Sequence, residues 1–244
     1  MDFGQLIVTA PTPAGKLRAS INLGNMILAS RVPPQGDPFG VSVHLTRAFT
    51  EHLAVELELA VFDAAGKSVE AISNERADIG FLAVDVLRAQ AIAFTAPYLL
   101  IEGFDLVRDS SSITAKRDVD QPDNRVVEGK GSAYELFLSW ALEAAQTVHE
   151  PTSPTVVQTF VGQELEIAAG VNNDLRPMPA DCQAYGFATS GSWSSSKRSA
   201  RQRTRGPAAP AVLHQFLEEM KESGFVSTSL ARHEIAGASV APFA

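Results

Sequence analysis

Two short segments of the sequence carry residues that could bind an anion. Arg88 follows the apolar run 78–84 and comes three residues after Asp85. A guanidinium is a planar fork of donors that matches a carboxylate with two parallel hydrogen bonds. Gly131 and Ser132 precede a helical pattern, where backbone N–H groups and the helix dipole favour negative charge. The simpler alternatives are a surface ion pair for Arg88 and an ordinary capped turn at Gly131 and Ser132.

The segments that would position these residues alternate between strand-like and helix-like patterns. Period-two or continuous apolar runs predict strands, and apolar residues at helical spacing predict helices. The expected strands cover 17–23, 56–61, 78–84, 91–94, 101–107, 125–127, 147–149 and 167–171. The expected helices cover 41–53, 67–74, 133–145, 208–223 and 225–233, with one more beginning at Ser153. This alternation predicts an α/β architecture with mostly parallel sheets.

Composition narrows the classes of function. The 244 residues carry a formal net charge of −8, which argues against nucleic-acid binding over the whole surface. The single cysteine, Cys182, excludes an internal disulfide and a cysteine-cluster metal site. The apolar runs are too short for a membrane span. No metal-ligand spacing relates the five histidines, His44, His52, His149, His214 and His233. We therefore expect no metal and no cofactor.

Three blocks of sequence carry a family resemblance. They are DIGFLAVDVLR at 78–88, IAFTAPY at 92–98 and GKGS at 129–132. Their order is similar to that of the family 3 solute-binding proteins of ABC transporters, which have a hydrophobic strand, T-x-x-R, an F-S-x-P-Y block and a later G-x-G-T/S turn. The resemblance implies a two-lobed, periplasmic-binding-protein-like type II fold with a ligand cleft. One lobe would comprise 1–103 and 207–244, and the other 104–206.

The resemblance also implies roles for individual residues. Arg88 would hold a ligand carboxylate from one lobe, while Gly131 and Ser132 would face it from the other. Asn25 stands at the family's position for a first-lobe contact, although asparagine is also an ordinary turn residue. Asp85 replaces the family's threonine or serine, and it could hold an ammonium group or cap a helix. The late-strand aspartate that binds the amine in many amino-acid binders is missing from this sequence.

The leading functional interpretation is the substrate-binding component of an ABC importer, which captures a small anionic or zwitterionic solute. The resemblance implies an ABC permease as partner, a monomer and a periplasmic location. The N-terminal residues show no signal peptide, so cytoplasmic retention stays open. One alternative is a cyclohexadienyl or arogenate dehydratase-like enzyme, with Glu102 or Asp85 as general acid. Others are a LysR-type regulatory domain, which would need a preceding helix-turn-helix, and the product of a decayed gene.

The segment 181–206 breaks the strand and helix rhythm, because it is rich in serine and arginine and has neither period. The codons for Cys, Tyr, Phe and Trp, and most of those for Ser, begin with T. If the reading frame is shifted so that each first codon base becomes a middle base, these positions have T in the middle of the codon and therefore encode Phe, Leu, Ile, Met or Val. Permissible codons then read LPGLRVRDVRVMVIEQAVGTPKNPR, which resembles the family's missing strand and crossing segment. We therefore expect a frameshift here, local disorder and weak coupling between the lobes. The alternative is a genuine basic loop.

Overall fold

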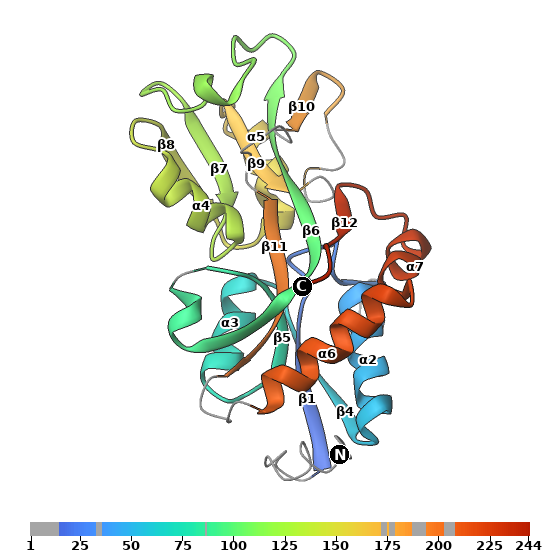
Figure 1. The fold of residues 1–244 in the computed structure, drawn as a ribbon. Coiled ribbons are helices and arrows are strands. Elements are labelled where there is room, and N and C mark those ends of the chain that lie inside the picture. Colours follow the sequence, from blue (N-terminus) through green and yellow to red (C-terminus); the bar gives the residue numbers. More distant parts are fainter. Residues whose placement is uncertain are drawn as a thin grey trace.

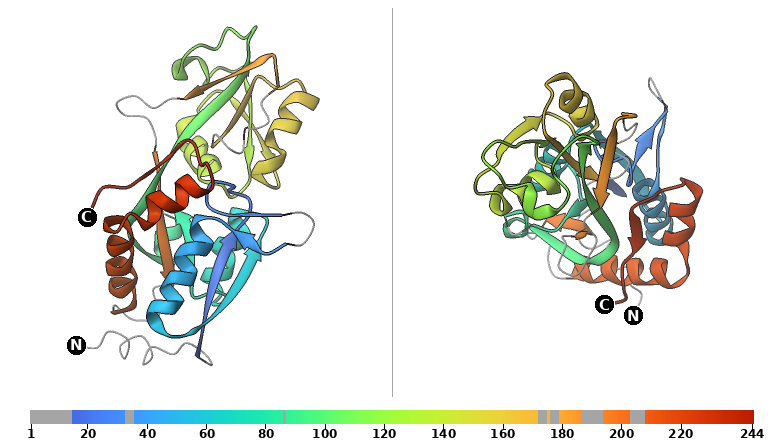
Figure 2. Two further views of the ribbon diagram at one scale, coloured as in Figure 1. Left: turned by 90° about the vertical axis from the view of Figure 1, so that its right-hand side faces the viewer. Right: turned by 90° about the horizontal axis from the view of Figure 1, so that it is seen from above.

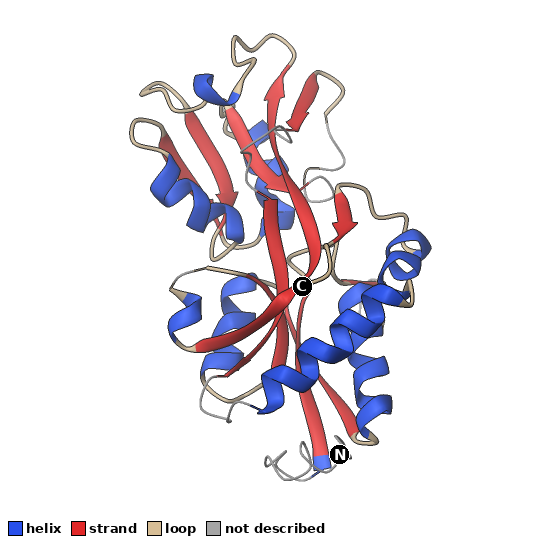
Figure 3. Ribbon diagram, viewed as in Figure 1, coloured by secondary structure: helices blue, strands red, loops and turns tan. Residues whose placement is uncertain are grey.

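The computed structural model describes residues 15–32, 36–85, 87–171, 175, 179–186, 194–202 and 208–244. The elements gather at two ends of the molecule, and the long strand β6 (Ile92–Arg108) runs from one end to the other (Figure 1). Two further views show the same elongated arrangement (Figure 2). Helices lie on the outside of the strands at both ends (Figure 3).

A parallel sheet forms the end that contains the first strands of the chain. Strand β1 (Lys16–Asn22) lies between β4 (Glu56–Phe62) and β5 (Ile79–Ala83), and both pairings are parallel. Helices α2 (Val41–Leu53) and α3 (Ala65–Ser73) connect these strands. All five residues of β5 are buried, as a continuous apolar run predicts. A small antiparallel pair joins β2 (Ser30–Arg31) and β3 (Pro38–Phe39).

A second parallel group forms the other end. Strand β7 (Arg125–Gly129) lies between β8 (Gln146–Glu150) and β9 (Ile167–Val171), with parallel pairing on both sides. Helices α4 (Ala133–Ala141) and α5 (Val156–Gly162) connect them. Short 3-10 helices are η2 (Arg88–Gln90), η3 (Lys116–Asp118) and η4 (Ser153–Thr155). The strand and helix alternation expected from the sequence is therefore present in both ends of the molecule.

Helix α4 ends at Ala141, earlier than the expected end at residue 145. The Asp120 carboxylate accepts hydrogen bonds from the backbone N–H groups of Glu143, Ala144 and Ala145 at 2.8–3.1 Å. A side chain that satisfies these donors competes with the helical hydrogen bonds they would otherwise make. The apolar period alone could not reveal this distant acceptor.

The two strands expected at 91–94 and 101–107 are in fact one continuous strand, β6. Its pairing changes along its length. Residues 92–102 pair with β11 (Ser194–Gln202), whereas residues 103–108 pair with β9 and β10 (Cys182–Gly186). Pro97 lies within β6 and has no N–H to donate, and the register of β11 shifts around its partner Arg198. The proline therefore coincides with an irregular pairing and does not end the strand.

The expected disorder of 181–206 is wrong for two of its parts, because β10 and β11 are strands. Strand β11 is a central strand, antiparallel to β5 on one side and to β6 on the other. Residues 187–193 and 203–207 lie outside the described residues. The backbone position of β11 is that of a return crossing from one end of the molecule to the other (Figure 1). The polar sequence of β11 thus pairs directly with β5, a strand whose five residues are all buried.

The chain finishes against its first half. Helix α6 (Ala208–Glu222) packs near β6, and α7 (Phe225–Arg232) packs against α2. The short strand β12 (Ala238–Val240) pairs with β6 at Leu99–Ile101. The helices at 208–223 and 225–233 are thereby confirmed to within one residue. None of the helices in the described part of the chain is long and apolar enough to cross a membrane.

Candidate functional site

Arg88 bridges the two ends of the molecule. It opens the short helix η2 after strand β5, and its side chain reaches the turn between β7 and α4. Nη1 donates to the Ala83 carbonyl at 3.1 Å, and Nη2 donates to the Gly131 carbonyl at 2.7 Å. Burial lowers the pKa of this guanidinium, while the nearby Asp85 and Glu135 carboxylates oppose the shift, so the group stays charged. A guanidinium has five N–H donors, so these two contacts leave donors for a ligand.

Asp85 adopts the capping geometry that the sequence left as an alternative. Its Oδ1 accepts hydrogen bonds from the backbone N–H groups of Leu87 at 2.8 Å and Arg88 at 3.2 Å. The side chain therefore fixes the turn from which Arg88 projects. Its carboxylate also lies near enough to the Arg88 guanidinium to favour the charged form of that group.

Gly131 lies where the backbones of the two ends come close together. Its φ is +70°, in the left-handed region that glycine adopts without strain. A Cβ at this position would lie 3.0 Å from both the Cα and the N of Gly66, which belongs to α3. Its N–H donates to the Glu135 carboxylate, and its carbonyl accepts from Arg88. Gly131 is therefore needed for this close backbone contact, whereas a Cβ on Gly66 would reach only an ordinary contact distance of 3.9 Å from the Gly131 Cα.

We expect Gly131→Ala to destabilise the protein by roughly 1–2 kcal/mol, because alanine is strained at this φ and its Cβ would press on the backbone of Gly66. The melting temperature, followed by circular dichroism, should fall by about 2–8 °C. Gly162→Ala is the matched control, since a Cβ there meets nothing within 4 Å. A Gly131→Ala protein that melts together with wild type would contradict this account of the contact.

Ser132 is the N-cap of α4. Its Oγ accepts hydrogen bonds from the backbone N–H groups of Tyr134 and Glu135, both at 3.1 Å, and its own N–H donates to the Gly129 carbonyl at 3.0 Å. The donors expected to be free for an anion thus have partners within the chain. An anion that binds at the start of α4 would have to replace the Glu135 carboxylate as the acceptor of the Gly131 N–H.

Asn25 is a buried turn residue after β1. Its Oδ1 accepts from the Ile27 N–H at 3.2 Å, and its backbone carbonyl accepts from Leu28 and Ala29. Arg88, Asp85, Gly131 and Ser132 are thus linked through direct or shared hydrogen bonds. Within the described residues, no hydrogen bond or ion pair connects Asn25 to them, so its ligand role stays a prediction.

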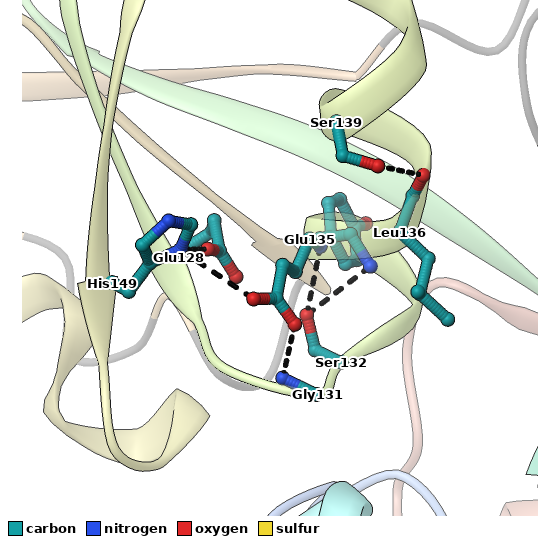
Figure 4. A network of polar contacts seen from close by, with 8 residues as sticks. Glu128, Gly131, Ser132, Glu135, Leu136, Ser139 and His149 are labelled. Carbon is teal, nitrogen blue, oxygen red and sulfur yellow. Dashed lines mark hydrogen bonds and ion pairs between the residues drawn. The ribbon is translucent and has the colours of Figure 1, made fainter.

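Sequence reasoning missed a polar cluster beside this turn, formed by Glu128, Glu135 and His149 (Figure 4). Glu128 is the penultimate residue of β7 and lies opposite His149 in the parallel register of β8, while Glu135 lies in the first turn of α4. His149 Nδ1 contacts Glu128 Oε1 directly and lies 3.7 Å from Glu135 Oε1. The ligand atoms of all three residues lie within 4.8 Å of one another. No spacing along the sequence could reveal this group, because strand register brings it together.

The Glu128 carboxyl is fully buried, and its Oε2 has no partner within hydrogen-bond geometry among the residues that the structure describes. Burial raises the pKa of Glu128 to about 7, and the contact with His149 opposes the rise. Glu102, the other general-acid candidate named from the sequence, is exposed, and its backbone carbonyl accepts from the Tyr134 hydroxyl at 3.4 Å. Neither Glu102 nor the capping residue Asp85 has the buried environment that Glu128 has.

A separate cavity of about 80 Å³ lies between β6 and α4, lined by Asp105, Lys116, Phe104, Phe137 and Leu138 among others. Burial raises the pKa of Asp105 to about 7, and Lys116 opposes the rise. Because this carboxyl binds its proton more tightly in the folded chain, the free energy of unfolding should fall as pH rises from about 4 to 7.

We expect Asp105→Asn to remove part of this pH dependence. At pH 8 the free energy of unfolding of Asp105→Asn should exceed that of wild type by about 2 kcal/mol, and at pH 4 the two should differ little. Asp105 is partly exposed, so solvent screening reduces the gain below that of a fully buried carboxyl. Urea unfolding at the two pH values measures it. Asp109→Asn, at an exposed position, is the control. Parallel pH profiles for wild type and Asp105→Asn would contradict the assignment.

No protein-family model and no curated protein matches the sequence. Solved structures do match. A solute receptor for L-cysteine from Neisseria gonorrhoeae has a TM-score of 0.81 at 13% identity, covering 96% of this chain and 99% of that chain. An ABC-transporter binding component from Wolinella succinogenes, complexed with lysine, has a TM-score of 0.77 at 18% identity, covering 90% and 95%.

An ancestral amino-acid-binding protein, described as a precursor of cyclohexadienyl dehydratase, has a TM-score of 0.77 at 15% identity, covering 94% and 97%. This chain has their fold. The two-lobed α/β fold of amino-acid-binding proteins of ABC transporters was the architecture expected from the sequence, and it is confirmed. The two ends described above correspond to the two lobes of that fold.

Proposed function

We propose that this chain is the substrate-binding component of an ABC importer and captures a small amino-acid-like or carboxylate-bearing solute between its lobes. The observation that carries the proposal is the Arg88 guanidinium, which projects from one lobe and donates to the Gly131 carbonyl of the other. A ligand carboxylate bound to the remaining donors of Arg88 would be held where both lobes meet. Closure of two lobes around a ligand is a common hinge motion of such folds.

The charges around Arg88 favour a zwitterionic amino acid over a simple anion. Asp85 and Glu135 both lie close enough to oppose the burial shift of the Arg88 pKa. Two carboxylates would repel a second negative group but would attract an ammonium group. We assign the carboxylate of the solute to Arg88 and its amine to the side of Asp85, which leaves Gly131 and Ser132 as the facing turn and Asn25 as a first-lobe contact. The structural relatives that bind lysine and L-cysteine support this class of solute.

The remaining features of the proposal follow from the same class of protein. We propose one lobe of residues 1–103 and 207–244 and another of residues 104–206. The first boundary lies in β6, close to where the partners of this strand change. The partner would be an ABC permease, the location periplasmic and the chain a monomer. Binding without catalysis is the simpler function for the described site, because Asp85 is occupied as a cap.

A thermal-shift screen of the full chain against the standard amino acids and small carboxylates tests the function. A solute that binds the folded state raises the melting temperature by mass action. At a free solute concentration of 100 times Kd, the free energy of unfolding rises by about 2.7 kcal/mol. A shift with one or a few amino acids supports the proposal. A flat screen with a sharp transition contradicts it, and turnover of prephenate or arogenate would replace it with the dehydratase alternative.

A further inference from the structure

The Glu128 side chain presents an unexplained buried charge-bearing group. It is fully buried, and among the described residues its Oε2 has no partner within hydrogen-bond geometry, although Oε1 contacts His149 and the Ser132 hydroxyl lies close enough to favour the charged form. A buried polar atom without a partner loses the hydrogen bonds it would make to water, and this cost is larger for an ionised group. Such atoms are rare in folded proteins and call for a ligand, an ion or a bound water to account for them.

The residues around Glu128 are those that bind transition metals. Imidazole nitrogen and carboxylate oxygen are ligands of Zn²⁺, Mn²⁺ and Ni²⁺, whereas Ca²⁺ and Mg²⁺ prefer oxygen alone. The 3.7 Å between His149 Nδ1 and Glu135 Oε1 is near the separation of about 3.4 Å between two ligands of a tetrahedral Zn²⁺. The direct contact between His149 Nδ1 and Glu128 Oε1 is shorter than that separation, so these two side chains must move apart to admit an ion. Two ionised glutamates and a neutral histidine would also balance the charge of a divalent cation.

We propose that Glu128, Glu135 and His149 form a binding site for one divalent transition-metal ion of the Zn²⁺ class. Three elements hold the ligands: β7, the neighbouring position of β8 and the first turn of α4. The His149 side chain is 45% exposed, which gives the ion a route from solvent to the buried Glu128. Positions beyond these three ligands remain for water or for a polar group of a solute.

The site adjoins the Arg88 bridge but does not depend on it. Glu135 also accepts the N–H of Gly131, whose carbonyl accepts from Arg88. Metal binding at Glu135 would therefore compete with its hydrogen bond to Gly131, the residue whose carbonyl Arg88 contacts from the other lobe. Because the metal ligands all belong to one lobe, the ion should bind without any solute.

Calorimetric titration of the untagged, EDTA-stripped full chain with ZnCl₂ tests the site, and CoCl₂ provides a visible absorption spectrum that reports coordination. We expect one equivalent of Zn²⁺ in wild type, and affinity weakened tenfold or more in Glu128→Gln and in His149→Ala. His214→Ala is the matched control, since its ring lies 3.9 Å from Glu218 and, in the described part of the chain, is not part of a possible metal site, so this variant should bind as wild type. Circular dichroism checks that each variant is folded.

Either of two results would overturn the proposal: wild type that binds Zn²⁺ and Co²⁺ no more tightly than about 1 mM, or folded Glu128→Gln and His149→Ala proteins that bind as wild type does. Displacement of Zn²⁺ by Ca²⁺ would overturn the assigned class of metal. Since no amino acid is present in this titration, failure of the metal site leaves the solute screen unaffected, and a flat solute screen leaves the metal titration unaffected.

Discussion

Replacing Arg88 with alanine is expected to weaken binding of a carboxylate-bearing solute by at least about 100-fold, because a charge-assisted hydrogen bond contributes about 1.5–3 kcal/mol and the fork supplies two, which together contribute about 3 kcal/mol or more. The substitution also removes the bridge to the Gly131 carbonyl, so the lobes lose a contact that exists before any ligand arrives. Calorimetry with the solute found in the screen measures the change. Arg88→Lys keeps the charge but not the fork, and it should recover only part of the affinity.

Arg76→Ala is the matched control for the removal of an arginine. That side chain is 54% exposed and pairs with Glu70 at 3.0 Å, away from the contacts of Arg88. Its loss should leave the affinity unchanged. If Arg88→Ala is folded and binds the solute as tightly as wild type, the guanidinium is a structural bridge only, and the ligand carboxylate lies elsewhere.

Replacing β11 by its frame-shifted reading is expected to raise the free energy of unfolding by about 4 kcal/mol or more. The nine residues SSSKRSARQ at 194–202 include three cations and four serines, yet the strand lies between β5 and β6. Helices α3 and α6 both approach it. The shifted reading VIEQAVGTP supplies two β-branched residues at its start, and each buried valine or isoleucine contributes about 1.5–3 kcal/mol.

Thermal melts compare the natural chain, the replaced chain and a control in which β11 carries the reversed sequence QRASRKSSS. A gain of 4 kcal/mol raises the melting temperature of a chain of this size by roughly 8–16 °C, and the reversed control should show none of it. Equal melting temperatures for all three would contradict a frameshift. Sequencing of the gene supplies an independent test, because the hypothesis requires two compensating insertions or deletions that flank the segment.

Much of the fold was predictable because it depends on local periodicity. The continuous apolar run of β5 and the helical spacing of α2 both identify their elements without tertiary information. The joining of two expected strands into β6 was not predictable, since Pro97 is tolerated there through an irregular pairing with β11. The early end of α4 depends on Asp120, a residue more than twenty positions away, which no local pattern contains.

The sequence by itself determined the α/β architecture and the residues at one strand end and one helix start, Arg88 and Ser132, because side-chain type and spacing encode local geometry. Only the tertiary structure decided which of these groups meet. It joined Arg88 to the Gly131 carbonyl, 43 residues away, and it set His149 against Glu128 through the parallel register of β7 and β8. Such contacts depend on how strands align and how the two lobes approach each other, and these are properties of packing that no single segment contains.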